Sequence, residues 1–391
     1  MSRTIFITIL AFAALISPIY GDADFPEDIP PNQTSEIMIK IQEEQPVDYD
    51  HAIIKGNIYV TEEKLLNNCI NSPIKIKDSK IYGIIIFENI DFNDKVDFEG
   101  TEFHGIVIFK NNTFNKDVRF FKTIFWNSTV FSNSIFAGYA DFENIQMIEE
   151  AFFDNTKFNT SFFSKSKFKN YTAFFNAQFL GFGDFSGTRF SGITDFHSTK
   201  FKNNADFNEC LFAEYANFWN ATFNESARFS FAKFERVADF RGTQFNNKVD
   251  FRYIYFSDIL IYWDSIKRNL FCGNSTYLAL INYFKENGHY KDARNCYYEY
   301  RDRERIGLPL GWSTPIEYLS WISCGYGVRP SFTILWINFF IILFASIYWR
   351  STLNSYKAMK RKNITIQIKR FINSLYFSFL VFFHINRSSY P

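Results

Sequence analysis

The sequence has little of what enzyme active sites and metal centres are usually built from. Its 391 residues include five cysteines and five histidines. No Cys-x-x-Cys or His-x-x-x-His spacing occurs, and neither does a Walker phosphate loop or a nucleophile elbow. The formal net charge is only +1, which gives no general attraction to nucleic acid. We therefore expect no catalytic residue, no cofactor, no metal site and no nucleic-acid partner.

What the sequence has in excess is phenylalanine, which accounts for 51 residues. Over residues 87–256 it returns alternately after five and six residues, as at Phe196, Phe201 and Phe207. This spacing fits neither an amphipathic helix, with a period of 3.6, nor a flat strand, with a period of two. It is typical of a chain that turns a corner every few residues and stacks each coil on the last.

The residue two positions before most of these phenylalanines is small or β-branched, as in Ala205-Asp206-Phe207. Side chains alternate along an extended backbone, so both members of each pair are expected to point toward the axis of the coil. The residue between them, often Asp or Asn, is expected to face solvent. Cys210 occupies a small inward position and is expected to be a core residue. One irregularity is expected at 153–163, where the interval is ten residues instead of eleven.

This Ala-(Asp/Asn)-Phe-x-x pattern resembles the pentapeptide-repeat family, although the six-residue steps depart from the family's strict five. The resemblance implies a mainly β fold over residues 87–256, a right-handed quadrilateral β-helix (a pentapeptide-repeat solenoid). Some family members resemble duplex DNA in shape and charge and bind topoisomerases, which requires a strongly acidic rod. Residues 87–256 contain 18 basic and 21 acidic residues, so we do not expect such mimicry here.

The residues before the repeats are interpreted as two segments. Residues 1–23 are predicted to be a secretory signal peptide, with Arg3 ahead of an apolar run at 5–16 and a small-x-small cleavage motif. That run is too short to span a bilayer comfortably, and an uncleaved anchor is the alternative. Residues 24–86, with a short helix at 35–44, are interpreted as a lead-in that caps the first coil.

After the repeats the pattern becomes helical. Residues 257–313 are predicted to form a helical hairpin, with helices at 276–286 and 290–305, that acts as a cap or spacer. The charged run at 299–305 is expected to be a solvated helix face. Residues 314–391 are interpreted as a membrane region.

Within this membrane region, residues 331–349 are mostly apolar and long enough to cross a bilayer as a helix. Seven basic residues and no acidic residue follow at 350–370, whereas Arg329 is the basic residue just upstream. The positive-inside rule therefore predicts a cytoplasmic C-terminal side and an extracytoplasmic repeat domain. Residues 371–385 form a second, shorter apolar stretch, expected to be an interfacial or pore-helix-like segment.

The C-terminal residues carry a second resemblance. Residues 324–330 (CGYGVRP), the hydrophobic helix and residues 374–379 (SLYFSF) are similar to archaeal pentapeptide-repeat proteins that end in a two-helix, potassium-channel-like unit. The resemblance implies a pore helix at 374–379, then a Thr-Val-Gly-Tyr-Gly-type filter and a second crossing helix. Neither of the latter follows in this sequence. Residues 325–327 (GYG) precede the first hydrophobic helix, and we interpret them as a turn at the membrane entrance.

The sequence thus favours two functions from different classes. The first is a non-enzymatic structural or interaction rod outside the cytoplasm, whose partners are the membrane and an unknown protein on the rod faces. The second is a truncated or subunit form of a potassium-channel-like ion transport protein, which would be a homo-oligomer. The missing filter favours the first function.

Overall fold

The computed structural model describes residues 33–61, 65–309, 311–355 and 364–383. The chain forms two compact units, Met1–Asn287 and Gly288–Pro391, and each is described by itself. The predicted signal peptide at 1–23 lies outside the described residues.

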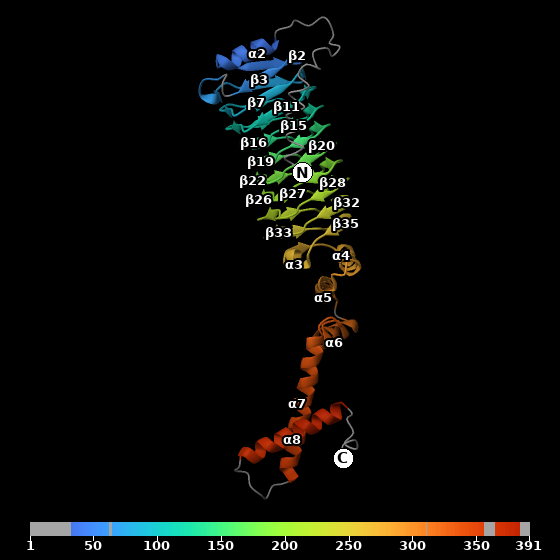
Figure 1. The fold of residues 1–391 in the computed structure, drawn as a ribbon. Helices are drawn as coiled ribbons and strands as arrows, with labels where there is room; N and C mark the ends of the chain where they lie inside the picture. Colours follow the sequence, from blue (N-terminus) through green and yellow to red (C-terminus); the bar gives the residue numbers. More distant parts are fainter. Residues whose placement is uncertain (1–32, 62–64, 310, 356–363, 384–391) are drawn as a thin grey trace. The chain divides into compact units, whose positions relative to one another are not determined.

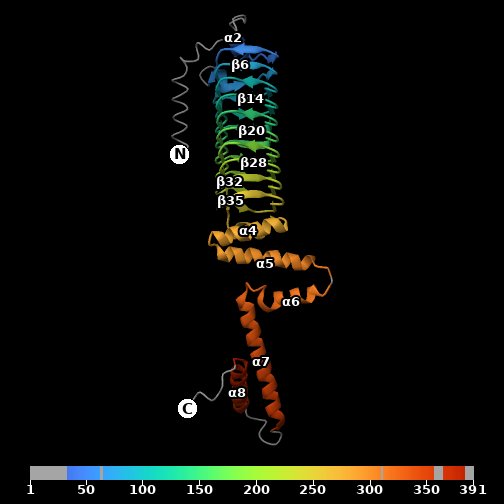
Figure 2. The ribbon, with the colours of Figure 1, turned by 90° about the vertical axis from the view of Figure 1, so that its right-hand side faces the viewer.

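The first unit is a β-solenoid in which short strands pair in parallel with the strands one coil earlier and one coil later (Figures 1 and 2). The strands form four stacks, here called flanks 1 to 4 in chain order around the coil. The predicted four-sided β-helix is therefore confirmed.

Flank 1 consists of β1 (Val47–Asp50), β5 (Ile74–Lys77), β9 (Val96–Asp97), β13 (Val118–Arg119), the second parts of β16 (Ile135–Asp141) and β19 (Lys157–Phe162), β23 (Gly183–Asp184), β27 (Ala205–Asp206), β31 (Ala227–Arg228), β34 (Val249–Asp250) and β36 (Leu270–Phe271). Flank 2 consists of β2 (Ile53–Lys55), β6 (Lys80–Tyr82), β10 (Glu102–Phe103), β14 (Ile124–Phe125), β17 (Gln146–Met147), β20 (Lys167–Phe168), β24 (Arg189–Phe190), β28 (Leu211–Phe212) and the first parts of β32 (Lys233–Asp239) and β35 (Tyr255–Leu260).

Flank 3 consists of β3 (Ile58–Thr61), β7 (Ile85–Glu88), β11 (Val107–Lys110), β15 (Thr129–Val130), β18 (Ala151–Phe152), β21 (Thr172–Ala173), β25 (Thr194–Asp195), β29 (Ala216–Asn217) and the second parts of β32 and β35. Flank 4 consists of β4 (Cys69–Ile70), β8 (Asp91–Phe92), β12 (Thr113–Phe114), the first parts of β16 and β19, β22 (Gln178–Phe179), β26 (Lys200–Phe201), β30 (Thr222–Phe223) and β33 (Gln244–Phe245).

The solenoid extends beyond the residues for which the phenylalanine spacing indicated it. It begins at β1, so much of the segment 24–86 forms coils and not the lead-in that the sequence predicts. Val47 pairs with Ile74, which makes the first coil longer than those that follow, and it contains the 3₁₀ helix η3 (Leu66–Asn68). Its inward positions hold Ile and Val, as at Ile54, so it lacks the phenylalanine signal. Helix α2 (Gln33–Gln42) packs on β1, β2 and β3.

Phenylalanine rings fill the interior, as the spacing predicted. Phe174 and Phe196, one coil apart, stack with ring centroids 4.8 Å apart and planes 1° apart. Phe185 meets Phe196 edge to face at 5.4 Å and 89°. These rings are fully buried, each burial contributes about 1.5–3 kcal/mol before entropy, and the offset and edge contacts add to it.

The small inward positions also carry a ladder of hydrogen bonds. Thr199 Oγ1 donates to Phe174 O at 2.7 Å, and Thr123, Thr188 and Thr243 make the equivalent 2.7 Å bond to Phe98, Phe163 and Phe218. Cys210 is buried in the same kind of position, with Sγ 2.9 Å from Phe185 O. Its predicted place in the core is confirmed.

The corners explain why steps of five and six residues alternate. Apart from the irregular step from Phe158 to Phe163, each five-residue step contains a residue with positive φ, which is often Asn or Gly, as at Asn111 (57°) and Gly100 (68°). These two residue types adopt the left-handed conformation most readily. The ten-residue interval corresponds to a register shift between β16 and β19, after Phe136.

The solenoid's C-terminal end is covered by α3 (Trp263–Ile266) and α4 (Asn274–Glu286). The inner side of α4 is buried, and Thr276 Oγ1 donates to Phe251 O at 3.1 Å. This bond repeats the Thr-to-Phe bond of the coils at the end of the stack.

The second unit contains α5 (Tyr290–Gly307), α6 (Ser313–Cys324), α7 (Pro330–Ser355) and α8 (Ile364–Phe382). Helices α4, α5 and α7 lie where helices were expected, whereas α6 was not predicted. In place of the fifteen-residue segment expected at 371–385, α8 has 19 residues and begins at Ile364. The turn expected at 325–327 is present, with positive φ at all three residues.

Candidate functional site

The outward positions of the solenoid differ from flank to flank, and flank 3 departs most from the expected pattern. On flank 1 charges of opposite sign face each other, as in Lys75–Asp48 (3.2 Å) and Arg119–Asp141 (3.4 Å). On flank 3 the residue between the two inward ones is apolar in consecutive coils. These side chains are Ile86, Ile108, Val130, Phe152 and Ala173.

Four of these side chains are buried although their register points them away from the axis. Ile108, Val130, Phe152 and Ala173 are 1–7% exposed and form one apolar cluster, with Ile86, Ile106 and Tyr171 packed against it. The expectation that this position faces solvent is therefore wrong for these coils. The signal was in the sequence, because Val107-Ile108-Phe109 and Ala151-Phe152-Phe153 replace the Ala-Asp-Phe pattern.

The same stack becomes polar in the following coils, at Asp195, Asn217 and Asp239. Each accepts a hydrogen bond through Oδ1 from the backbone N–H two residues later, at 2.9–3.0 Å. Such side-chain turns are a common role of Asp and Asn. The apolar residues at the same position in the five preceding coils have no side-chain oxygen and cannot accept this hydrogen bond.

Two carboxyl groups beside the apolar cluster are poorly solvated. Burial, followed by the nearby charge of Asp195, raises the pKa of Asp154 to about 7. Burial also raises the pKa of Asp195. The pKa of the nearby Tyr215 is raised to about 12 by burial and by the hydrogen bond that its hydroxyl donates to Asp239. Asp154 therefore titrates near neutral pH. Within the described ranges, however, no activated nucleophile lies beside it.

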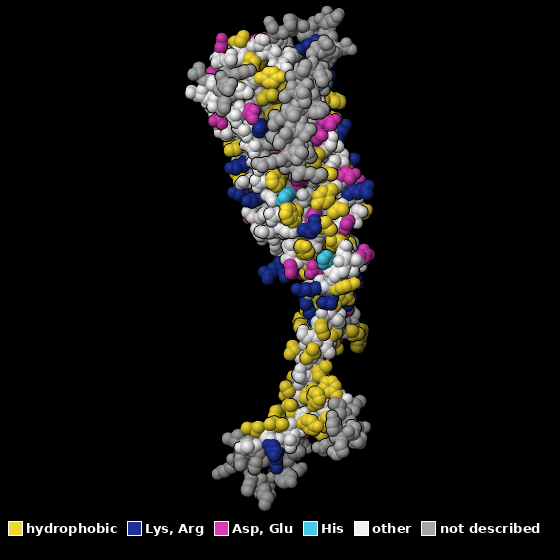
Figure 3. Space-filling model, in the orientation of Figure 1, with side chains coloured by type: hydrophobic (Ala, Val, Ile, Leu, Met, Phe, Trp, Pro, Cys, Tyr) yellow, Lys and Arg dark blue, Asp and Glu magenta, His cyan; other side chains and the backbone are white. Residues whose placement is uncertain are grey.

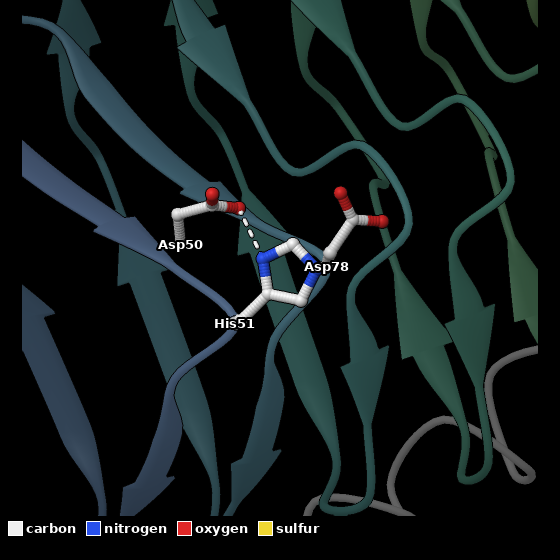
Figure 4. Close-up of side chains that lie close together, drawn as sticks. All are labelled: Asp50, His51 and Asp78. Atoms are coloured by element: carbon white, nitrogen blue, oxygen red, sulfur yellow. Dashed lines mark ion pairs between the residues drawn. The ribbon is translucent and has the colours of Figure 1, made fainter.

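Asp50, His51 and Asp78 form a second group with ligand atoms within 4.8 Å of one another (Figure 4). His51 Nδ1 is 3.0 Å from Asp50 Oδ1, and all three residues are exposed. The fold accounts for their proximity, because His51 and Asp78 are left-handed corner residues of successive coils, with φ of 51° and 44°. Their atoms are of the kind that binds divalent cations, but water competes freely at this site.

The third candidate surface belongs to α7 and α8. Among the described residues, α7 is the one helix long and apolar enough to cross a membrane. Eight of its large apolar side chains are 38–66% exposed: Ile334, Leu335, Phe339, Phe340, Ile342, Leu343, Phe344 and Ile347. Figure 3 shows hydrophobic side chains over much of its visible side. Contact with α8 covers only a narrow strip, where Ala345 is buried and Ser378 Oγ donates to Ile341 O at 2.9 Å.

Helices α5 and α6 are joined by arginine and aromatic side chains. Arg301 donates to both carboxylate oxygens of Glu317 at 2.7 Å, and Trp321 Nε1 donates to Tyr298 OH at 2.9 Å. Arg305 is largely buried and lies 4.3 Å from the ring centroid of Trp321. The charged run at 299–305 is therefore not a simple solvated face, since two of its arginines hold α6.

A comparison with protein families matches the model of pentapeptide repeats (9 copies) at residues 98–146, 174–222 and 185–232. No curated protein and no solved structure matches the chain. The matched residues lie wholly within the solenoid. The resemblance of the C-terminal residues to channel-like proteins is supported by none of these comparisons and stays a prediction.

Proposed function

We propose that this pentapeptide-repeat solenoid is a non-enzymatic interaction protein, held at a membrane by α7, with its repeats outside the cytoplasm. The observation that carries the proposal is the exposure of α7. A core helix of a soluble protein would be covered by the rest of the chain, whereas eight large apolar side chains of α7 remain exposed. Each would gain about 1.5–3 kcal/mol from leaving water, and a bilayer accommodates all of them together.

The contact between α7 and α8 supports the same environment. Helices associate in membranes through small residues that allow close approach and through hydrogen bonds between helices. Ala345 and Ser374 are both buried here, and Ser378 donates its hydrogen bond across to α7. The orientation rests on the seven basic residues at 350–370, which favour a cytoplasmic position for that segment.

A partner surface on the solenoid is supported by an aromatic corner. Phe231 and Tyr253 occupy successive corner positions with φ of 57° and 56°. Their rings stack with centroids 4.7 Å apart, and the side chains are 55% and 68% exposed. Bulky residues adopt this conformation at a cost of about 1–2 kcal/mol, and exposed aromatic side chains are common anchors of protein interfaces.

The membrane proposal is tested by alkaline carbonate extraction of membranes from cells that express the full chain. We expect the protein to stay in the membrane pellet. A Phe339→Arg/Leu343→Arg variant should move to the supernatant, because each central arginine costs about 2.5–3.5 kcal/mol on insertion. The matched control is Leu278→Arg on α4, an exposed leucine of the first unit, which should leave the pellet fraction unchanged. Extraction of the unaltered chain would refute the proposal.

A further inference from the structure

Helix α6 has one face that α5 holds in place. Glu317 and Trp321, one turn apart, bind Arg301 and Tyr298 through the hydrogen bonds described above. Arg305 also stacks on Trp321. Three contacts therefore fix the rotation of α6 about its own axis.

The opposite face of α6 is an uncovered apolar stripe. Trp312, directly before the helix, and then Ile316, Leu319 and Ile322 follow at intervals of three to four residues, which places them on one side. They are 43–95% exposed. Four large apolar side chains in one line are more than the scattered hydrophobic residues of an ordinary protein surface.

This stripe is continuous with the apolar surface of α7. Trp336 Nε1 donates to Ile322 O at 2.8 Å, so the end of α6 lies against the first turns of α7. Between the two helices is an open hollow of about 260 Å³ lined by Ile322, Phe332, Leu335, Trp336 and Phe339. Every lining residue is apolar.

We propose that α6 lies in the interfacial layer of the leaflet through which α7 enters, with its stripe among the lipid chains and an acyl chain in the hollow. This inference rests on the proposed membrane function and specifies the lipid contact that goes with it. An amphipathic helix with a tryptophan at its boundary suits the membrane interface. Continuity with α7 favours lipid over a protein as the occupant.

The charges of α6 specify the kind of lipid contact. The helix contains no Lys or Arg, and its one acidic residue, Glu317, is already paired with Arg301. Attraction to anionic headgroups therefore has no source on α6 itself. We expect the stripe to enter zwitterionic and anionic bilayers equally, because the contact is apolar.

The test uses the full chain in vesicles of phosphatidylcholine whose acyl chains carry bromine atoms near the carbonyl groups, which quench nearby tryptophans. Trp312→Phe isolates the signal of Trp312. We expect brominated lipid to quench the emission of Trp312, so that Trp312→Phe removes a quenched part of the total emission. The extent of this quenching should be the same when a third of the lipid is phosphatidylglycerol. If the lost emission is unquenched in brominated vesicles, or is quenched only with anionic lipid, the inference is overturned.

A second variant separates this inference from the membrane function. Ile316→Glu/Leu319→Glu should abolish quenching of Trp312 while the protein still resists carbonate through α7. The control Ser313→Glu, one turn before Glu317 on the face toward α5, should keep the quenching. A chain that resists carbonate but shows unquenched Trp312 refutes the inference alone. A chain that carbonate extracts refutes the proposed function. If Trp312 contacted a second copy of the chain or another protein instead of lipid, its emission would likewise be unquenched, which refutes the inference.

Discussion

Replacing Thr199 by valine tests whether the Thr-to-Phe hydrogen bonds stabilise the solenoid. Thr199 is fully buried, and its hydroxyl donates to Phe174 O at 2.7 Å. Valine has nearly the same shape, so the substitution removes the hydrogen bond without opening a cavity. Phe174 O also accepts a bond from the backbone N–H of Ala177 at 3.0 Å, so it keeps one partner. The expected loss is therefore about 1 kcal/mol, that of one net hydrogen bond, and not the larger cost of an orphaned carbonyl.

The matched control is Thr222→Val in the next coil of the same flank. Thr222 occupies the outward position of β30 and is only half-buried. Its replacement should change stability by less than about 0.5 kcal/mol. Both variants and the unaltered chain are unfolded with urea in detergent micelles and followed by far-ultraviolet circular dichroism. If Thr199→Val costs no more than Thr222→Val, the hydrogen-bond ladder does not stabilise the fold as argued.

Three further predictions follow from individual residues. Phe231→Asn should raise the urea midpoint, because Asn tolerates the left-handed corner that strains phenylalanine; a lower midpoint would contradict the strain argument. The pKa of Asp154 in the folded chain is raised above its value in the unfolded chain. Its carboxyl group therefore lowers the free energy of unfolding as pH rises from about 4 through 7. Asp154→Asn should therefore stabilise by about 1–2 kcal/mol at pH 8, after allowance for partial exposure, and hardly at all at pH 4; equal effects at both would refute the assignment. Ala345→Leu should separate α7 from α8, and unchanged cross-linking between them would contradict the close contact.

The core of the solenoid could be predicted because its signal repeats. Most inward phenylalanines stack on the one a coil away, as Phe174 does on Phe196, so a single packing rule acts along the chain and appears as a spacing. The phenylalanine spacing did not indicate the first coil, because the core of that coil is aliphatic. The apolar exterior of flank 3 departs from the expectation because Val107-Ile108-Phe109 has an apolar residue at the outward position that Asp206 occupies in Ala205-Asp206-Phe207.

The helical part was harder to predict because its contacts are not periodic. Helix α6 is held by several contacts with α5, and its ion pair Arg301–Glu317 joins residues that are 16 positions apart in the sequence. The sequence predicts a solvated face at 299–305, because it does not show that residues of α6 face these charged side chains. Helix α8 begins earlier than its apolar run, since Lys369 and Arg370 are accommodated within the helix. Spacing alone therefore specified the repeats but not the surfaces that surround them.

The central claim is that α7 lies within a bilayer, and thiol accessibility tests it most directly. In a chain whose native cysteines are replaced by alanine, Leu335→Cys and Leu343→Cys are placed along α7, and Leu278→Cys on α4 serves as the exposed reference. The variants are reconstituted in vesicles and treated with a membrane-impermeant maleimide. We expect Leu278→Cys to react and Leu343→Cys to remain unlabelled until detergent is added. Labelling of Leu343→Cys in intact vesicles as fast as that of Leu278→Cys would contradict the claim.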